Sequence, residues 1–155
     1  MTSFYCDYRI NSTTEQDIYD HFIECNDYFS PKLSDKVDIQ EYTHKIWKNT
    51  VRFEAILDSQ LIGLVAAYAN DPSKKCAFIT NVSTLPVYFG KGIGKKLLSQ
   101  CISYARKMEF RLIRLEVSVH SSAAISLYKT MGFETYDGTT TINRLQFNLN
   151  DNSKV

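Results

Sequence analysis

One glycine-rich stretch organises this 155-residue chain: Phe89-Gly90-Lys91-Gly92-Ile93-Gly94-Lys95-Lys96. It lies between a predicted strand over Cys76–Leu85 and a helical stripe of apolar residues that runs from Ile93 to Ala105. Closely spaced glycines let a backbone turn tightly and present several N–H groups together, and a helix N-terminus adds a positive dipole there. The three lysines add formal charge. The loop is therefore predicted to bind a phosphate or pyrophosphate, and a plain turn with a basic helix start is the alternative.

Two common phosphate-binding motifs do not fit this loop. A P-loop has four residues between its first glycine and its Gly-Lys pair, followed by Ser or Thr. Here three residues separate Gly90 from Gly94, and Lys96 follows Lys95. A dinucleotide fingerprint needs a third glycine at the position that Lys95 occupies. Neither an ATPase nor a dehydrogenase is favoured.

The elements around the loop alternate in a way that predicts an α+β domain. Hydrophobic periodicity gives the order βααβββαβαββ, with antiparallel hairpins first and one parallel crossover later. We expect a single-domain, mostly antiparallel twisted sheet of about seven strands with helices on both faces. The domain is expected to span residues 1–150, and residues 151–155 to form a C-terminal tail. The predicted strands are 4–10, 51–57, 61–69, 76–85, 112–119, 133–136 and 140–149. The first predicted helix follows the capping residues 11–14, and the other predicted helices are 39–47, 93–105 and 121–131. A polar break is predicted at 30–38 and a turn at 137–138.

Composition excludes several classes of protein. Hydrophobic residues make up 44% of the chain and charged residues 23%, which is ordinary for a globular domain. No apolar run reaches the roughly 18 residues that a membrane-spanning helix needs, and Met1–Ile10 shows no secretory signal. Cys6, Cys25, Cys76 and Cys101 fit no CxxC or zinc spacing. We expect free thiols, no metal, no membrane association and a cytoplasmic location.

The net charge of +1 excludes a strongly basic nucleic-acid binder. This average hides an asymmetry, because residues 1–60 carry 11 acids and 6 bases whereas residues 61–155 carry 6 acids and 12 bases. A domain charged in this way can offer one end to an anion and the other to a cation.

Two motifs together resemble those of the GNAT superfamily of acetyl-CoA-dependent N-acetyltransferases. The family loop reads Arg/Gln-x-x-Gly-x-Gly/Ala at the start of its third helix, which matches Val82–Gly94. Its later helix reads Asn-x-x-Ala-x-x-x-Tyr with Gly-Phe soon after, which matches Ser121–Phe133 with Ala124 and Tyr128 in place. The resemblance implies the acyl-CoA N-acyltransferase fold and acetyl-CoA as co-substrate.

The resemblance also implies where acetyl-CoA binds. In such proteins the strand before the glycine loop splays from the next strand, and pantetheine lies in the resulting V; here a bulge is expected near Asn81. The pyrophosphate would lie on backbone N–H groups of the loop, so the basic half of the chain faces the anionic co-substrate. The implied binding residues are Val82, Ser83, Thr84, Leu85, Phe89, Gly90, Lys91, Gly92, Ile93, Gly94, Lys95, Ser121 and Ala124.

Three positions depart from the family pattern. Phe89 stands where the family has Arg or Gln, so side-chain support for the pyrophosphate is expected to be weaker. Ser121 replaces the Asn of the second motif, although a hydroxyl still donates and accepts hydrogen bonds. Phe78 stands where many members have a glutamate, which leaves the identity of the general base open.

The resemblance points to Tyr128 as the proton donor to the leaving thiolate, because a tyrosine with a pKa of about 10 is protonated at neutral pH. A tyrosine that only packs its ring on the sheet is the alternative. Backbone N–H groups near Leu85 are expected to polarise the thioester carbonyl. His120, at a predicted strand end, is the candidate base. Three alternatives stay open: His120 is only a surface residue, Glu116 is the base, or ordered water carries the proton. His21 and His44 are interpreted as structural or solvent-facing.

The acceptor is expected near residues 19–49, where acids and aromatic side chains gather; we select Tyr28, Phe29 and Tyr42 as substrate-binding residues. The favoured partner is a small-molecule primary amine. A protein or peptide acceptor is the second hypothesis, and a non-catalytic acyl-CoA-binding module is the third. A homodimer is also considered, because Thr140–Leu149 is predicted as an edge strand that a second chain could pair with.

Overall fold

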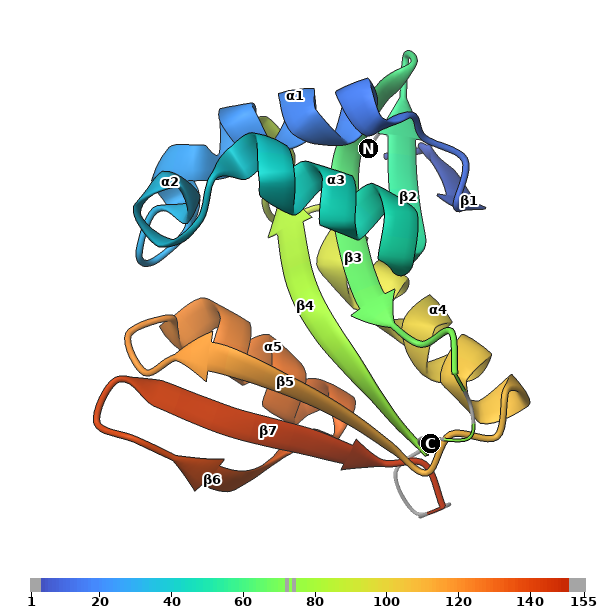
Figure 1. Ribbon diagram of the computed structural model, residues 1–155, viewed down its shortest axis with the longest axis vertical. Coiled ribbons are helices and arrows are strands. Elements are labelled where there is room, and N and C mark those ends of the chain that lie inside the picture. Colours follow the sequence, from blue (N-terminus) through green and yellow to red (C-terminus); the bar gives the residue numbers. More distant parts are fainter. Residues whose placement is uncertain (1–3, 72, 74, 151–155) are drawn as a thin grey trace.

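Seven strands form one twisted sheet in the order β1-β2-β3-β4-β5-β7-β6 (Figure 1). The computed structural model describes residues 4–71, 73 and 75–150, so the predicted tail at 151–155 lies outside the described residues. Neighbouring strands are antiparallel except β4 and β5, which are parallel. The predicted α+β fold is confirmed. The strands are β1 Asp7–Ile10, β2 Val51–Leu57, β3 Gln60–Tyr68, β4 Cys76–Thr84, β5 Leu112–Ser118, β6 Glu134–Gly138 and β7 Ile142–Asn148.

Helices cover both faces of the sheet. In Figure 1, α1 and α3 lie in front of β2–β4, whereas α4 lies behind them and α5 behind β5. Each face has its own apolar layer: Ile18, Phe22 and Ile46 pack with Leu64 on one side, and Leu97 belongs to the larger cluster on the other. The helices are α1 Glu15–Cys25, α2 Leu33–Lys36, α3 Ile39–Asn49, α4 Ile93–Lys107 and α5 Ser122–Met131, with 3₁₀ turns η1 Asn26–Tyr28 and η3 Pro86–Tyr88.

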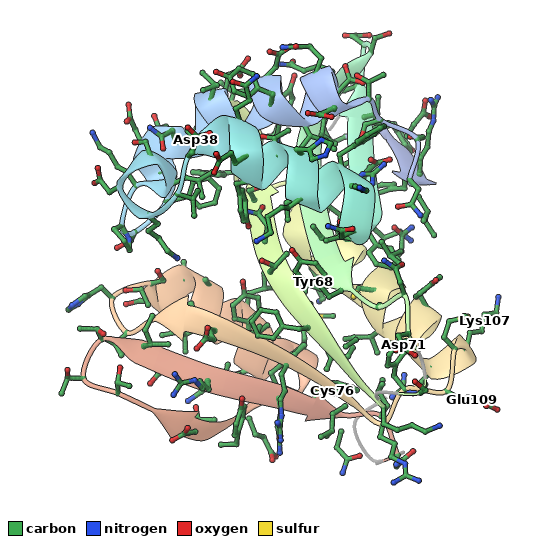
Figure 2. The ribbon with its side chains drawn as sticks, viewed as in Figure 1. Asp38, Tyr68, Asp71, Cys76, Lys107 and Glu109 are labelled. Atoms are coloured by element: carbon green, nitrogen blue, oxygen red, sulfur yellow. The ribbon has the colours of Figure 1, made fainter. Side chains whose placement is uncertain are left out.

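Polar caps fix where α1 and α3 begin. Thr14 accepts a hydrogen bond from the Asp17 N–H, and the Asp17 carboxylate accepts one from the Thr14 N–H, which forms a capping box. The Asp38 carboxylate accepts from the Glu41 N–H over 2.9 Å at the start of α3, where Figure 2 labels Asp38. These caps hold the two helices over the strands that border the site.

Three local expectations were wrong. The polar break contains the one-turn helix α2, because Leu33 reaches the core with 6% of its surface exposed. The turn expected at residues 137–138 belongs to β6; the chain turns at residues 139–141, where Thr139 Oγ1 accepts from the Ile142 N–H. The strand over Thr140–Leu149 is not itself an edge, because β7 pairs with β5 on one side and β6 on the other. The edge that this hairpin leaves is β6, and the homodimer stays a prediction.

Strands β4 and β5 separate after a short parallel contact. Their pairing runs only from Cys76 and Leu112 to Ile79 and Leu115, and Figure 1 shows them diverging from that shared end. A bulge lies at the point of separation. Ala66 and Ala67 of β3 are consecutive, but they pair with Asn81 and Ile79, so Thr80 is the extra residue. A bulge was expected near Asn81 in the sequence, and its place opens a V-shaped gap in the sheet.

Candidate active site

The divergence of β4 from β5 opens a continuous cleft with two ends. One end, of about 980 Å³, lies along β4 and the glycine loop, and the other, of about 720 Å³, lies against the segment before α2. We call them the loop end and the acceptor end. Both ends are lined by Tyr28, Ser30, Val82, His120, Ser121 and Ala124, so they meet at these side chains.

The backbone of β4 offers hydrogen-bonding groups to this cleft. The Leu85 N–H donates to the Ile62 carbonyl over 2.8 Å, which fixes the alternation along the strand. Because backbone groups of successive strand residues point to opposite sides, the N–H and C=O of Val82 and Thr84 point away from β3 and into the V. An extended amide-bearing ligand can pair with these groups as an added strand would.

The glycine loop presents the N-terminus of α4 to the same cleft. Gly90 and Gly92 both have φ of +78°, a conformation that side-chain-bearing residues seldom adopt, and a Cβ at either would meet nothing within 4 Å. Both glycines are therefore required by backbone conformation and not by space. The Lys96 N–H makes an early helical bond to the Gly92 carbonyl, so the N–H groups of Ile93 and Gly94 have no helical acceptor. This is a site for an anion.

Close packing holds the loop against the sheet. A Cβ on Gly63 of β3 would lie 2.5 Å from Ile93 Cγ2 and 3.3 Å from Leu97 Cδ1. Only glycine at this position lets the first turn of α4 approach β3 so closely. The anion site is consequently anchored to a central strand.

The structure brings most of the predicted cofactor residues together and separates two of them. Leu85 is buried and its N–H is already bonded to Ile62, so the expected role of this N–H at the thioester carbonyl is not available. The Lys91 ammonium lies 6.0 Å from the centroid of the Phe4 ring, and Lys91 does not line the cleft. The predicted residues that line the loop end are Val82, Ser83, Thr84, Phe89, Gly90, Gly92, Ile93, Gly94, Lys95, Ser121 and Ala124.

Tyr128 comes from α5 and lines the acceptor end. Only 6% of its surface is exposed, and its ring packs on Phe133 with centroids 6.0 Å apart. Burial raises the pKa of Tyr128 to about 12, so its hydroxyl keeps its proton at neutral pH. Within the described part of the chain no residue hydrogen-bonds to this hydroxyl, which leaves it available to a ligand. The sequence offered two alternatives for Tyr128, a proton donor or a ring that packs on the sheet. In the structure the ring packs and the hydroxyl keeps its proton.

His120 and Glu116 occupy different environments. His120 is exposed in the turn between β5 and α5 and borders both ends of the cleft. Glu116 also lines the acceptor end, but its carboxylate accepts from Arg144 Nε over 2.9 Å, and Arg144 also contacts Asp137. Because Glu116 is held in this ion-pair network, His120 is the better placed of the two to exchange a proton.

Aromatic side chains wall the acceptor end, as expected for Tyr28, Phe29 and Tyr42. Tyr28 meets Phe89 edge-on with ring centroids 6.0 Å apart, so Phe89 bridges the cleft where the family has a polar residue. Tyr42 donates to the Thr80 carbonyl at the bulge over 3.1 Å. Sequence patterns did not single out the other residues that line this end, because distant segments supply them: Pro31, Leu33, Lys36, Thr80, Asn81, Val117, Ser118, Thr141 and Ile142.

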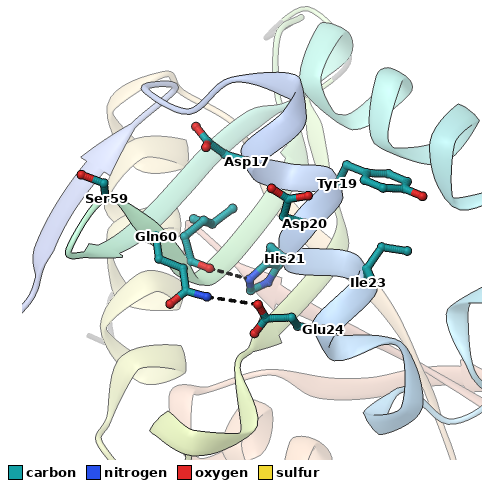
Figure 3. A pocket seen from close by; sticks show the side chains of 9 residues that line it. Asp17, Tyr19, Asp20, His21, Ile23, Glu24, Ser59 and Gln60 are labelled. Carbon is teal, nitrogen blue, oxygen red and sulfur yellow. Dashed lines mark hydrogen bonds between the residues drawn. The ribbon is translucent and has the colours of Figure 1, made fainter.

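A separate surface pocket of about 440 Å³ lies over α1 and the β2–β3 turn (Figure 3). Asp17, Asp20 and Glu24 line it, and Glu24 accepts from Gln60 Nε2 over 3.2 Å. His21 closes its floor, with Nδ1 2.9 Å from the Leu61 carbonyl. His21 is 2% exposed, so the structural interpretation of this histidine applies.

Three further features of the described residues concern metal ligands, membrane-spanning helices and disulfides. Within residues 4–71, 73 and 75–150, no three His, Cys, Asp or Glu side chains are grouped as metal ligands. None of the helices in the described part is long and apolar enough to cross a membrane. Cys6, Cys25, Cys76 and Cys101 are all free thiols.

Comparison with known proteins agrees with this geometry. An uncharacterized N-acetyltransferase of Methanocaldococcus jannaschii is 30% identical over 142 residues, which cover 82% of this chain and 61% of that protein. The chain thus spans about three-fifths of that curated relative.

Solved structures share the fold at low sequence identity. The ribosomal-protein-S18-alanine N-acetyltransferase from Escherichia coli superposes with a TM-score of 0.73 at 18% identity, covering 92% of this chain and 94% of that one. The PaiA N-acetyltransferase from Thermoplasma acidophilum, in complex with coenzyme A, gives 0.70 at 18% identity and covers 92% and 99%. The family model described as the acetyltransferase (GNAT) family matches residues 15–133. The chain therefore belongs to the GNAT acetyltransferase family.

Proposed function

We propose that this protein transfers an acetyl group from acetyl-CoA to a primary amine of a small molecule by direct attack. One observation carries the proposal: a single cleft connects an anion-binding helix N-terminus to an aromatic-walled end, with the protonated Tyr128 beside the junction. The two reactants need binding sites that meet, and this cleft provides them.

The loop end suits acetyl-CoA. The N–H groups at the start of α4 match a pyrophosphate, and the N–H and C=O groups of Val82 and Thr84 match the amides of pantetheine. Lys95 lines this end, and Lys91 and Lys96 are exposed around the start of α4. A solved relative of the same fold is described in complex with coenzyme A, which supports the same ligand class here.

The chemistry requires one bond to form and one to break. The amine nitrogen attacks the thioester carbonyl carbon, a C–N bond forms, and the C–S bond then breaks to release CoA thiolate. The backbone N–H of Val82, directed into the V, can donate to the oxyanion. Tyr128 donates a hydrogen bond to the thiolate and supplies its proton, while the amine loses one proton to a base. The tyrosine proton returns from solvent through the cleft.

His120 is the proposed base, because it is exposed and borders both ends of the cleft. It takes the proton of the attacking amine directly or through water. In the alternative mechanism ordered water alone takes this proton. A His120→Gln variant would then turn over at the wild-type rate, whereas loss of a His120 base would lower turnover.

The acceptor end favours a small molecule. Its volume of about 720 Å³ lies within the range of roughly 300–1,000 Å³ that is usual for small-ligand sites. Aromatic walls suit a cationic amine. A protein N-terminus is the second candidate, supported by the description of one structural relative as a ribosomal-protein-alanine N-acetyltransferase. We place the reaction in the cytoplasm, since all four cysteines are free thiols.

The first experiment combines binding and turnover. We expect acetyl-CoA and CoA, but not ATP or NAD, to raise the melting temperature, because only the first two fit both the anion site and the V. Acetylation of tyramine, benzylamine, spermidine, glucosamine and an alanine-terminated peptide then compares acceptor classes. Peptide acetylation without amine acetylation would replace the small-molecule proposal, and binding without any turnover would favour a non-catalytic acyl-CoA-binding module.

A further inference from the structure

A chain of polar groups runs from the interior of α1 to the acceptor end. His21 Nε2 lies 2.8 Å from Ser83 Oγ, which lies 2.8 Å from Asn81 Oδ1. Asn81 Nδ2 is 3.5 Å from Tyr42 Oη, and Tyr42 donates to the Thr80 carbonyl. His21, Asn81 and Ser83 are all buried, with 2%, 7% and 8% exposed. Asn81, Tyr42 and Thr80 line the acceptor end, so the chain links a buried helix residue to the place where the amine binds.

The proton on each nitrogen of His21 follows from its partners. The Leu61 carbonyl can only accept, so His21 Nδ1, 2.9 Å away, must carry a proton. Ser83 has one hydroxyl proton but two partners at hydrogen-bond distance, the histidine Nε2 and the Asn81 side chain. If His21 is neutral, Ser83 donates to Nε2. As the Asn81 amide is placed, Ser83 donates to Oδ1 and Nδ2 faces Tyr42. A neutral His21 requires the reverse orientation of this amide, with its NH₂ donating to the serine and its oxygen toward Tyr42 and the cleft.

A cationic His21 would reverse this arrangement. Its Nε2–H would donate to Ser83, Ser83 would donate to the Asn81 oxygen, and the Asn81 NH₂ would face the cleft. The two ends of an asparagine amide have nearly the same shape, so both orientations occupy the same space. The charge on His21 therefore decides which end of the Asn81 amide meets the acceptor.

The surroundings of His21 favour the neutral form. Its ring is enclosed by Leu61, Ser83 and the Cys25 thiol, whose sulfur lies 3.7 Å from Nε2. Among the described residues no carboxylate hydrogen-bonds to the ring. The carboxylates of Asp17, Asp20 and Glu24 line the pocket between α1 and the β2–β3 turn (Figure 3). Burial lowers the pKa of His21 to about 4, and the bond to Leu61 offsets only part of this effect.

We propose that neutral His21, acting through Ser83, is a positioning residue that turns the carbonyl oxygen of Asn81 into the acceptor end, where this oxygen accepts a hydrogen bond from the N–H of the acceptor amine. Asn81 Oδ1 and Tyr42 Oη then present lone pairs to the same space. An ammonium ion docks on this pair and keeps one bond to Asn81 after it loses a proton, so the lone pair that it gains can attack. The site thereby selects acceptors whose nitrogen carries hydrogen. The inference rests on the proposed function, because it assigns a role within amine acetylation.

The test uses two pairs of variants, with tyramine as the acceptor. Asn81→Asp keeps an oxygen toward the amine but cannot donate to Ser83, so kcat/KM for tyramine should fall about fivefold, as expected for a broken link to His21, whereas Asn81→Leu, which removes both groups, should lose about tenfold or more. Ser83→Ala breaks the link to His21 and should lose about fivefold, and Ser83→Thr, which keeps the hydroxyl, should recover most of it. The KM for acetyl-CoA should not change in the Asn81 variants, because Asn81 lines the acceptor end and not the loop end. A fully active Ser83→Ala, or a fully active Asn81→Leu, would overturn the inference.

A second measurement does not depend on turnover. Imidazole nitrogen NMR of the uniformly labelled protein at about pH 7 should show His21 as the neutral form with its proton on Nδ1. A doubly protonated ring would overturn the inference even in an active enzyme. If the wild type acetylates no amine of the panel, the proposed function fails, while the NMR result still decides the proton arrangement of His21.

Discussion

Tyr128 combines two properties at the residue scale that seldom occur together. It is a core residue whose ring packs on Phe133, and its hydroxyl has no hydrogen-bond partner among the described residues. Tyr128 lines the cleft, where a ligand or water can serve as the partner of its hydroxyl. With a pKa raised to about 12, the hydroxyl keeps its proton at neutral pH. These properties fit a group that stabilises a leaving thiolate.

Replacing Tyr128 by Phe should therefore separate chemistry from folding. We expect kcat to fall about 100-fold because the thiolate loses its donor. The KM for acetyl-CoA and the melting temperature should stay near the wild-type values, since no protein hydrogen bond is lost. Tyr104→Phe is the matched control, because Tyr104 packs on Phe53 away from the cleft and its variant should turn over normally. Wild-type kcat in Tyr128→Phe would remove Tyr128 from the mechanism.

His21 should give folding stability a pH dependence. Its pKa is about 4 in the folded protein, below the ordinary value of 6.5, so between these values the unfolded chain binds a proton that the folded chain does not. The free energy of unfolding is therefore unaffected above about pH 6.5 and decreases by about 3 kcal/mol as the pH falls to about 4. Urea unfolding of the wild type and His21→Asn measures this slope. His44→Asn, at an exposed position, should keep it, and an unchanged slope in His21→Asn would contradict the assignment.

At the scale of elements, one buried carboxylate fixes how β2 meets the start of α1. Glu54 has no exposed surface and accepts hydrogen bonds from Ser12 N–H and Oγ–H, each over 2.8 Å, and from Thr13. Arg52 Nε lies 3.3 Å from the same carboxylate, and the Arg52 guanidinium also donates to the Trp47 carbonyl at the end of α3. Both members of the ion pair lie on β2, so the pair joins this strand to the segment before α1 and to the end of α3.

Removing this charge should destabilise the fold strongly. Glu54→Gln leaves the buried Arg52 without a counter-ion, and we expect a loss of about 3 kcal/mol in the free energy of unfolding. Glu116→Gln removes an ion pair with Arg144 that is partly open to solvent and should cost under about 1 kcal/mol. Chemical denaturation of both variants compares the two environments. Equal losses would show that the Glu54 pair contributes no more than a surface pair.

At the scale of the whole molecule, acidic and basic residues are divided between the two halves of the chain. Residues 1–60 carry five more acids than bases and supply the helices at the acceptor end, whereas residues 61–155 carry six more bases than acids and supply the glycine loop. Lys91, Lys95 and Lys96 are exposed around the start of α4. On the proposed function, the exposed lysines at the glycine loop attract the anionic co-substrate to the loop end.

Binding of acetyl-CoA should consequently depend on salt. We expect its dissociation constant to rise several-fold between low and high ionic strength, because added ions screen the exposed lysines. Lys95→Gln should weaken binding at low salt and flatten this dependence. Lys48→Gln, on α3, is the control and should leave both quantities unchanged. A dissociation constant that does not respond to salt would mean that backbone groups alone hold the pyrophosphate.

Patterns within short segments were enough to predict much of this protein. The apolar stripe of α4 follows from the spacing of Leu97, Leu98 and Cys101, and the positive-φ turns follow from Gly90 and Gly92. The pairing of that loop with Tyr128 and Gly132 was enough to identify the family. Each of these signals depends on residues that are neighbours along the chain, where backbone geometry and side-chain period act directly.

Only the tertiary structure decided how distant segments meet. In the folded chain β7 lies inside the sheet, and the Leu85 N–H donates to the Ile62 carbonyl. His21 contacts Ser83, which is 62 residues away in the sequence. The physical reason is that a hydrogen bond or ion pair between distant segments leaves no periodic trace along the chain. Its partners are chosen when the sheet pairs and the two apolar layers close. The sequence determined the family, the strand and helix types and the anion loop, whereas packing determined the acceptor end.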